Sequence, residues 1–112
     1  MTKILVNPGA CGLPAKVDVK KENGEKFSVT ITSQCKMVAK LGEEIQHLTM
    51  KDAFTRLLEN PVYKKGATCL RHVACPVPSG ILKALEVEAG LNVPKDVSIS
   101  FIAEEKTEEG GA

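Results

Sequence analysis

Two stretches of alternating apolar and polar residues constrain the fold of this chain more than any other feature. Apolar side chains stand at every second position over residues 15–19 and again over residues 27–31. Alternation with a period of two is typical of a β-strand that buries one face. The connecting residues include Asn23-Gly24, a pair that favours a tight turn. The sequence therefore predicts a β-hairpin over residues 15–32.

The register of this hairpin follows from the need to bury one face. A three-residue loop over residues 22–24 places Val19 opposite Phe27 and brings all the apolar side chains to one side. Continued outward, the same register places Cys11 opposite Cys35. Directly opposed strand residues have Cβ atoms roughly 4.5–5.5 Å apart, which is close enough for two sulfur atoms to share one metal ion.

Three helices are expected after the hairpin. Apolar residues at helical spacing predict a first helix over residues 37–48, with His47 exposed on it. Thr49 is a suitable N-cap for a second helix, which Asn60-Pro61 would end. The expected buried face of this second helix consists of Ala53, Phe54, Leu57 and Leu58.

The third expected helix has Ser79 as its N-cap and ends at Gly90. Alternating apolar residues over residues 97–101 predict a C-terminal strand, and residues 2–6 form a further short strand. The predicted fold class is α+β, with an antiparallel β-sheet packed on about three helices. The sheet is expected to consist of the hairpin 15–32 and the C-terminal strand.

A length of 112 residues allows one domain, which we assign to residues 1–103, followed by an acidic and disordered tail over residues 104–112. The 15 basic and 14 acidic residues are interspersed and aromatic residues make up only 4%, so no nucleic-acid partner is expected. No stretch approaches the roughly 20 apolar residues of a membrane helix. The N-terminal apolar run is too short for a signal peptide. We therefore expect a cytoplasmic protein with no membrane partner.

The four cysteines carry the chemistry that the sequence suggests. Thiols stay reduced in the cytoplasm, so several cysteines in one small domain favour metal binding or redox chemistry over a disulfide framework. Each cysteine is expected in a loop or at the end of an element, where ligands converge. Thiolates bind both Zn²⁺ and iron–sulfur clusters. The predicted ligands of a zinc ion or an iron–sulfur cluster are Cys11, Cys35, Cys69 and Cys75, with His72 as a further candidate.

Other interpretations of the cysteines remain open. Cys75 could be the nucleophile of a thiol redox or sulfur-carrier protein. The four residues could also be small buried hydrophobes in an interaction module. Disulfides pairing Cys11 with Cys35 and Cys69 with Cys75 would require an oxidising compartment. No phosphate-binding loop or hydrolase motif accompanies the cysteines, so a non-enzymatic protein is expected, with a metal ion and another protein as partners.

The order of these motifs resembles that of two families. The Ala10-Cys11-Gly12 turn, the charged hairpin, Cys35 at a helix start and Cys75 ahead of a helix resemble the NifU/IscU-like iron–sulfur cluster scaffold proteins. This resemblance implies the IscU-like fold and a link to iron–sulfur cluster assembly. The four cysteines and the Cys75-Pro76 step are also similar to the TSCPD domain, which occurs alone and at the end of some ribonucleotide reductases. The whole chain looks like a small uncharacterised family from anaerobic microbes, which implies no activity.

Two positions depart from the scaffold pattern. Scaffold proteins have an aspartate two residues after the first cysteine, where it keeps the bound cluster labile, and this chain has Leu13. Their histidine immediately precedes the last cysteine, where this chain has Ala74. A site made only of thiolates suits Zn²⁺ or a retained cluster better than a cluster meant for transfer. The resemblance therefore favours a metal site over cluster delivery.

Overall fold

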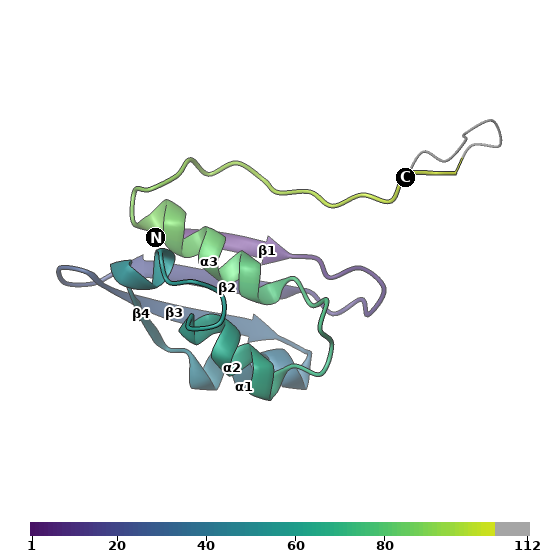
Figure 1. Cartoon of the computed structure of the whole chain (residues 1–112), viewed down its shortest axis with the longest axis horizontal. Helices are drawn as coiled ribbons and strands as arrows, with labels where there is room; N and C mark the ends of the chain where they lie inside the picture. The colour runs from purple at the N-terminus through teal and green to yellow at the C-terminus, as the bar shows by residue number, and fades with distance from the viewer. Residues whose placement is uncertain (105–112) are drawn as a thin grey trace.

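The computed structural model describes residues 1–104. In chain order its elements are β1 (Thr2–Val6), β2 (Ala15–Lys21), β3 (Lys26–Ser33), α1 (Lys36–Glu44), β4 (His47–Thr49), the 3-10 helix η1 (Met50–Ala53), α2 (Pro61–Cys69) and α3 (Val77–Glu88) (Figure 1). The strands form an antiparallel sheet in the order β1-β2-β3-β4. The predicted α+β class is confirmed. The predicted acidic tail lies, apart from Glu104, outside the described residues.

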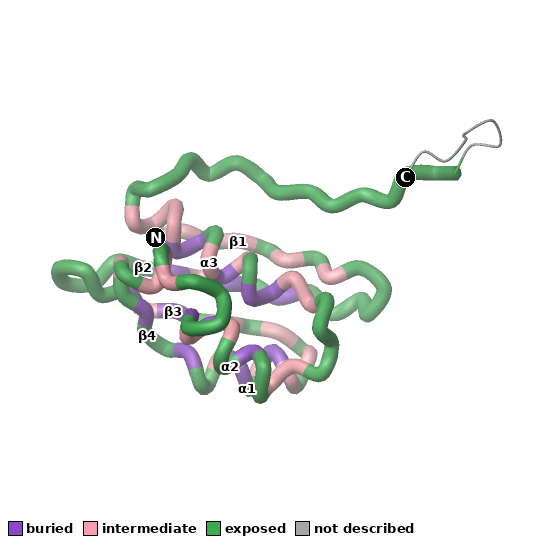
Figure 2. The backbone as a smooth tube through the Cα atoms, in the orientation of Figure 1, coloured by how far each residue is buried: buried purple, intermediate pink, exposed green. Residues whose placement is uncertain are grey.

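The core lies between one face of the sheet and the helices. Alternate residues of β2 and β3 point into it, while the residues between them, such as Lys16 and Thr30, face solvent. Figure 2 shows the buried positions gathered where α1 and α3 pack against the strands. The fully or nearly fully buried apolar residues are Ala15, Val17, Val19, Phe27, Val29, Val38, Leu41, Ile45, Leu48, Val62, Val77, Ile81, Ala84 and Leu85.

The predicted hairpin forms, but its predicted register is wrong by two residues. Val19 pairs with Val29 rather than with Phe27. The turn lies one residue later, because the Lys26 N–H donates to the Asn23 carbonyl at 3.0 Å, with Gly24 at φ 59°. A shift of two residues leaves the same side chains on the buried face, so burial alone does not distinguish the two registers.

The membership of the sheet also differs from the prediction. Residues 97–101 are exposed and belong to no strand, so the predicted C-terminal strand is wrong. The outer strands are β1 and β4 instead. Leu48, predicted in the first helix, lies on β4 instead. α1 ends earlier than predicted because Ile45 has extended backbone angles, φ −119° and ψ 93°. His47 is exposed as expected, but it lies on β4.

The second predicted helix is much shorter than expected. Thr49 caps it as predicted, and the Thr49 N–H donates to the Asp52 carboxylate at 2.8 Å in a capping box. The helix that follows is only η1, since the chain then leaves the surface of the core. Phe54, Leu57 and Leu58 are consequently exposed rather than buried.

Asn60-Pro61 begins a helix rather than ending one. The Asn60 Oδ1 atom accepts the Val62 N–H at 3.0 Å, and Pro61 occupies the first helical position, which needs no N–H partner. The Asn60 side-chain amide donates to the carbonyls of Asp52 at 2.8 Å and Thr55 at 3.0 Å. Asn60 therefore joins η1 to α2.

α3 begins three residues earlier than predicted and ends at the predicted glycine. Pro76 is its N-cap, and the Ser79 hydroxyl donates to the Pro76 carbonyl at 3.0 Å within the first turn. Gly90 has φ 76°, and the Leu91 N–H donates back to the Glu86 carbonyl at 2.9 Å. This left-handed ending is the one that glycine favours.

Gly80 allows α3 to lie close against β1. A Cβ atom at this position would lie 2.7 Å from Val6 Cγ2 and 3.2 Å from Ile4 Cδ1. Gly66 in α2 offers a matched comparison, because a Cβ atom there would make an ordinary contact of 3.6 Å with Pro78 Cγ.

We expect Gly80→Ala to lower the free energy of unfolding by about 1–3 kcal/mol, because the overpacking of β1 outweighs the helix propensity of alanine. Gly66→Ala should leave that free energy unchanged or raise it by up to about 1 kcal/mol. Urea denaturation of the two variants checks this. Equal effects of the two substitutions would contradict the close packing of α3 on β1.

Glu88 connects the end of α3 to the sheet. Its carboxylate accepts the Thr2 hydroxyl at 2.7 Å and the Lys21 N–H at 3.0 Å, and it lies 3.6 Å from the Met1 amino group. Partial burial raises the pKa of Glu88, but the two hydrogen bonds and the positive amino group outweigh this effect. The net result is a pKa below the ordinary value of 4.5.

The lowered pKa of Glu88 makes a pH dependence of stability testable. A carboxyl group whose pKa is lower in the folded state stabilises the fold above its unfolded pKa, and this contribution is lost as the pH falls through the folded value. We expect Glu88→Gln to weaken the loss of stability below about pH 5, because the substituted side chain binds no proton. Urea denaturation at several pH values, with Glu86→Gln as the control, tests this. If the free energy of unfolding of Glu88→Gln fell at low pH as steeply as that of the unsubstituted protein, this role of Glu88 would be contradicted.

Within residues 1–104, no helix combines the length and the apolar character that crossing a membrane requires.

Candidate metal site

Three segments that are distant in the sequence meet at one end of the sheet (Figure 1). They are the connection between β1 and β2, the junction of β3 with α1, and the loop between α2 and α3. A cavity of about 260 Å³ lies between them. Its walls are mostly apolar and include Pro8, Ala10, Leu13, Val38, Leu70, Ala74 and Val77.

Four of the five predicted ligand residues line this cavity. Cys11 comes from the first segment, Cys35 from the second, and His72 and Cys75 from the third. Cys69 is not among the lining residues. It is the last residue of α2, packs against the core, and has its sulfur 3.9 Å from the Thr68 hydroxyl.

Cys11 lies in a tight turn before β2. The Gly12 N–H donates to the Gly9 carbonyl at 2.9 Å, and the φ angles are 91° at Gly9 and 68° at Gly12. L-residues with side chains rarely adopt such angles, so the two glycines make the turn possible. The turn leaves Cys11 exposed at the rim of the cavity.

Cys35 is the N-cap residue of α1, but its side chain makes no capping bond, so the sulfur is not used by the helix. The Ser33 hydroxyl accepts the Cys35 N–H at 3.1 Å and donates to the Pro14 carbonyl at 2.9 Å. Ser33 therefore ties the backbone of Cys35 to the segment that carries Cys11. The sequence interpretation missed this role. A serine two residues before the N-cap position of a helix is its only signal in the sequence.

Cys75 lies immediately before Pro76, the N-cap of α3, and is therefore closer to the helix than the sequence suggests. Its N–H donates to the His72 carbonyl at 3.1 Å, which closes a short turn in the loop. Both α1 and α3 thus begin beside the cavity. The first-turn N–H groups of a helix have no partner within the helix, so they can hydrogen-bond metal-bound sulfur. In α3 only Val77 and Ser79 can offer such groups, because Pro76 and Pro78 have no N–H.

The donor set suits a metal ion, but the side chains are not arranged around one. Three thiols and one imidazole form a Cys₃His set, which is a common ligand set of Zn²⁺. Within the described part of the chain, no three His, Cys, Asp or Glu side chains are grouped to hold a metal ion. Cys11 and His72 are exposed, whereas Cys35 and Cys75 are half-buried. Shared coordination would require the two exposed loops to close over the cavity.

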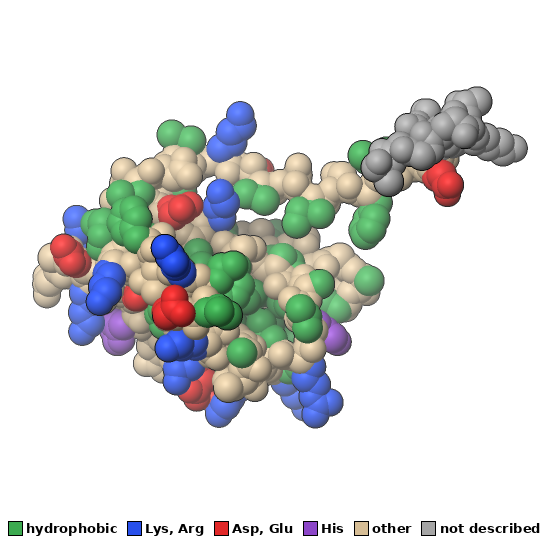
Figure 3. Space-filling model, in the orientation of Figure 1, with side chains coloured by type: hydrophobic (Ala, Val, Ile, Leu, Met, Phe, Trp, Pro, Cys, Tyr) green, Lys and Arg blue, Asp and Glu red, His purple; other side chains and the backbone are tan. Residues whose placement is uncertain are grey.

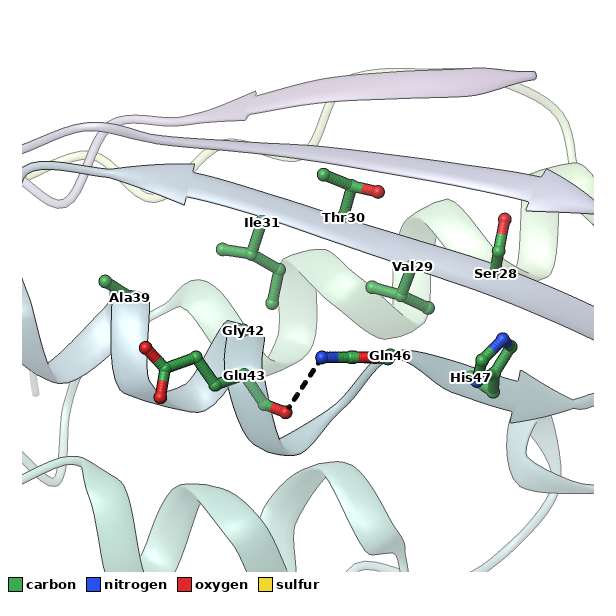
Figure 4. A pocket seen from close by; sticks show the side chains of 9 residues that line it. All are labelled: Ser28, Val29, Thr30, Ile31, Ala39, Gly42, Glu43, Gln46 and His47. Atoms are coloured by element: carbon green, nitrogen blue, oxygen red, sulfur yellow. Dashed lines mark hydrogen bonds between the residues drawn. The ribbon is translucent and has the colours of Figure 1, made fainter.

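A second concave region is an open groove of about 380 Å³ between β3, α1 and β4 (Figure 4). The Gln46 side chain in it donates to the Glu43 carbonyl at 3.4 Å. The Ser28 hydroxyl bonds the Glu22 carboxylate at 3.0 Å rather than His47. The groove therefore offers no pairing of a nucleophile with a base, and it contains no cysteine. The cysteine-lined cavity is the better candidate.

Comparison with known proteins identifies the family of the chain. No curated protein and no solved structure matches it. The model of DUF6951, a family of unknown function, matches residues 2–101, a span that includes the four cysteines and His72. The chain therefore belongs to the DUF6951 family.

Proposed function

We propose that this protein is a small, non-enzymatic metal-binding protein that holds one Zn²⁺ ion through Cys11, Cys35, Cys75 and His72. One observation carries the proposal: cysteines from three distant segments, together with a histidine, line a single cavity. Cysteines that only fill space in a core would have no reason to gather at one partly open site.

Zinc suits this donor set for chemical reasons. Zn²⁺ accepts thiolate sulfur and imidazole nitrogen in tetrahedral geometry, and a site with four protein ligands is closed to substrate. Such a site is structural rather than catalytic. Binding would link the Cys11 turn to the starts of α1 and α3, so part of the binding free energy would stabilise the fold. The required free thiols fit a reducing compartment such as the cytoplasm.

An iron–sulfur cluster is the second candidate, and the size of the cavity permits it. About 260 Å³ is far more than the roughly 30 Å³ that one water molecule occupies in the liquid. The cavity therefore has room for a cluster as well as for a single ion. The likeness to cluster scaffold proteins supports the same candidate, although Leu13 and Ala74 replace their aspartate and histidine.

The identity of the ligands can be tested by comparing the cysteines with one another. We expect Cys35→Ser and Cys75→Ser to lose most of the metal that the purified protein carries, because each removes a thiolate at the cavity. Cys69→Ser is the matched control and should keep its metal, since Cys69 does not line the cavity. Elemental analysis of the reduced variants provides the measurement. Retention of metal by all three variants would contradict metal binding at the cavity. Loss of metal in Cys69→Ser alone would mean that the metal binds at Cys69, outside the cavity.

A further inference from the structure

β1 is an outer strand whose far edge has no neighbouring strand in the described part of the chain. The Val29 N–H donates to the Gln46 carbonyl at 2.9 Å, so the main chain of Val29 points away from β2. Main-chain groups alternate in direction along an antiparallel strand. The registers of β3 with β2 and of β2 with β1 carry this alternation across the sheet. The N–H and carbonyl groups of Thr2, Ile4 and Val6 therefore point toward β2. The N–H and carbonyl groups of Lys3 and Leu5 consequently point outward at the open edge.

The residues that follow α3 have the pattern of a strand but no partner. Val97, Ile99 and Phe101 are 60%, 86% and 103% exposed, and serines separate them. We call residues 97–102 the C-terminal arm. It leaves the body of the molecule as an extended segment, and hydrophobic side chains project from it into solvent (Figure 3). The family match continues through Phe101, so most of the arm belongs to the family's domain.

The dimensions of the molecule agree with an arm that is not packed. The radius of gyration is 15.6 Å, whereas a compact chain of this length has a value of about 13 Å. The longest extent is 56 Å, against 30 and 25 Å in the other directions. Exposing a run of large apolar side chains in this way costs free energy unless another surface covers them.

We propose that the C-terminal arm forms a β-strand along the β1 edge of a second copy of this chain, and that the exchange is reciprocal. β1 has five residues and the arm has six, so both are roughly 17–20 Å long at strand spacing. An added strand would satisfy the outward groups of Lys3 and Leu5. It would also cover Leu5, which is 61% exposed.

The direction of α3 favours a second copy over the chain's own edge. A Cβ atom at Gly80 would meet Val6, and Glu88 bonds Thr2, so α3 runs antiparallel to β1 and ends beside the start of β1. The arm would therefore lie parallel to β1 of its own chain, as its course in Figure 1 also indicates. Parallel pairing is slightly less stable per residue than antiparallel pairing. A two-fold dimer allows the antiparallel arrangement, and it covers the β1 edges of both copies at once.

The proposal is tested by measuring the mass of the full chain in solution by sedimentation equilibrium. We expect a dimer, and we expect Ile99→Asp to raise its dissociation constant by about tenfold or more, because a charge would enter the strand interface. Ser100→Asp places the same charge on the opposite face of the arm and should leave the dimer largely intact. Circular dichroism of both variants checks that the body remains folded.

Hydrogen exchange of the edge amides separates this pairing from the alternatives. In the dimer, the Lys3 and Leu5 amides should be protected, and Ile99→Asp should remove that protection. A wild-type monomer with exposed edge amides would overturn the proposal. A monomer with protected edge amides would show that the arm pairs within its own chain, which also overturns it. A dimer that Ile99→Asp does not weaken would place the interface elsewhere.

Discussion

Removal of bound metal is expected to lower the free energy of unfolding by about 4 kcal/mol when free zinc is present at about a thousand times its dissociation constant. The reason is that the three cavity-lining cysteines and His72 come from segments that lie far apart in the unfolded chain, so only the folded chain brings them together. Thermal or urea unfolding of the reduced protein, with zinc and with an excess of chelator, measures the difference.

The cysteine variants make this stability measurement specific. Cys35→Ser should unfold with the same free energy with and without zinc, since it lacks one of the three thiolates that line the cavity. Cys69→Ser should keep the full dependence on zinc, whatever packing free energy the substitution costs. A dependence on zinc that is equally large in Cys35→Ser would mean that zinc binds outside the cavity.

Replacement of Asn60 should be the most damaging single change of a polar side chain. Asn60 is 2% exposed, and its side chain makes three hydrogen bonds. Asn60→Ala leaves the carbonyls of Asp52 and Thr55 and the N–H of Val62 without their partner, at an expected cost of about 2–4 kcal/mol in the free energy of unfolding.

Two further variants separate the roles of the Asn60 side chain. Asn60→Asp keeps the oxygen that caps α2 but loses the amide that donates to Asp52 and Thr55, so an intermediate loss is expected in chemical denaturation. Asn92→Ala is the control, because the exposed Asn92 side chain bonds, among residues 1–104, only the neighbouring Val93 N–H, at 2.9 Å. If Asn60→Ala destabilised no more than Asn92→Ala, Asn60 would not join η1 to α2 as described.

The local elements with a strong signal could be predicted from the sequence. Alternation identified the hairpin, helical spacing identified α1, and Gly90 marked the end of α3. The register could not be fixed because shifts of two residues bury the same face. α2 was missed because only Val62 and Gly66 of that helix are buried, which leaves no apolar stripe to detect.

The C-terminal segment shows a different limit of sequence interpretation. The alternation at residues 97–101 indicates a strand, but a pattern states which side chains favour burial and not which surface covers them. Within one described chain these residues remain exposed. If the arm pairs with a second copy, the strand predicted from the sequence would form only in the dimer.

The candidate site could be predicted in part. The sequence singled out the cysteines and His72 by residue type, but their spacing gave no information about which of them share a cavity. The predicted proximity of Cys11 and Cys35 follows from a hairpin register that is wrong, yet both residues line the cavity. They do so because a glycine-rich turn and the Ser33 hydroxyl bring the segments together, and such loop contacts leave little periodic signal.

The most direct test of the metal-binding proposal is elemental analysis with an absorption spectrum, on untagged protein purified without oxygen. The proposal predicts one zinc per chain and a colourless solution. Iron and sulfide with visible absorption would show that the ligand of the same cavity is an iron–sulfur cluster rather than zinc. Protein that carries neither metal, with four titratable thiols and no uptake of added zinc, would contradict metal binding and leave a role for Cys75 in thiol chemistry to be examined.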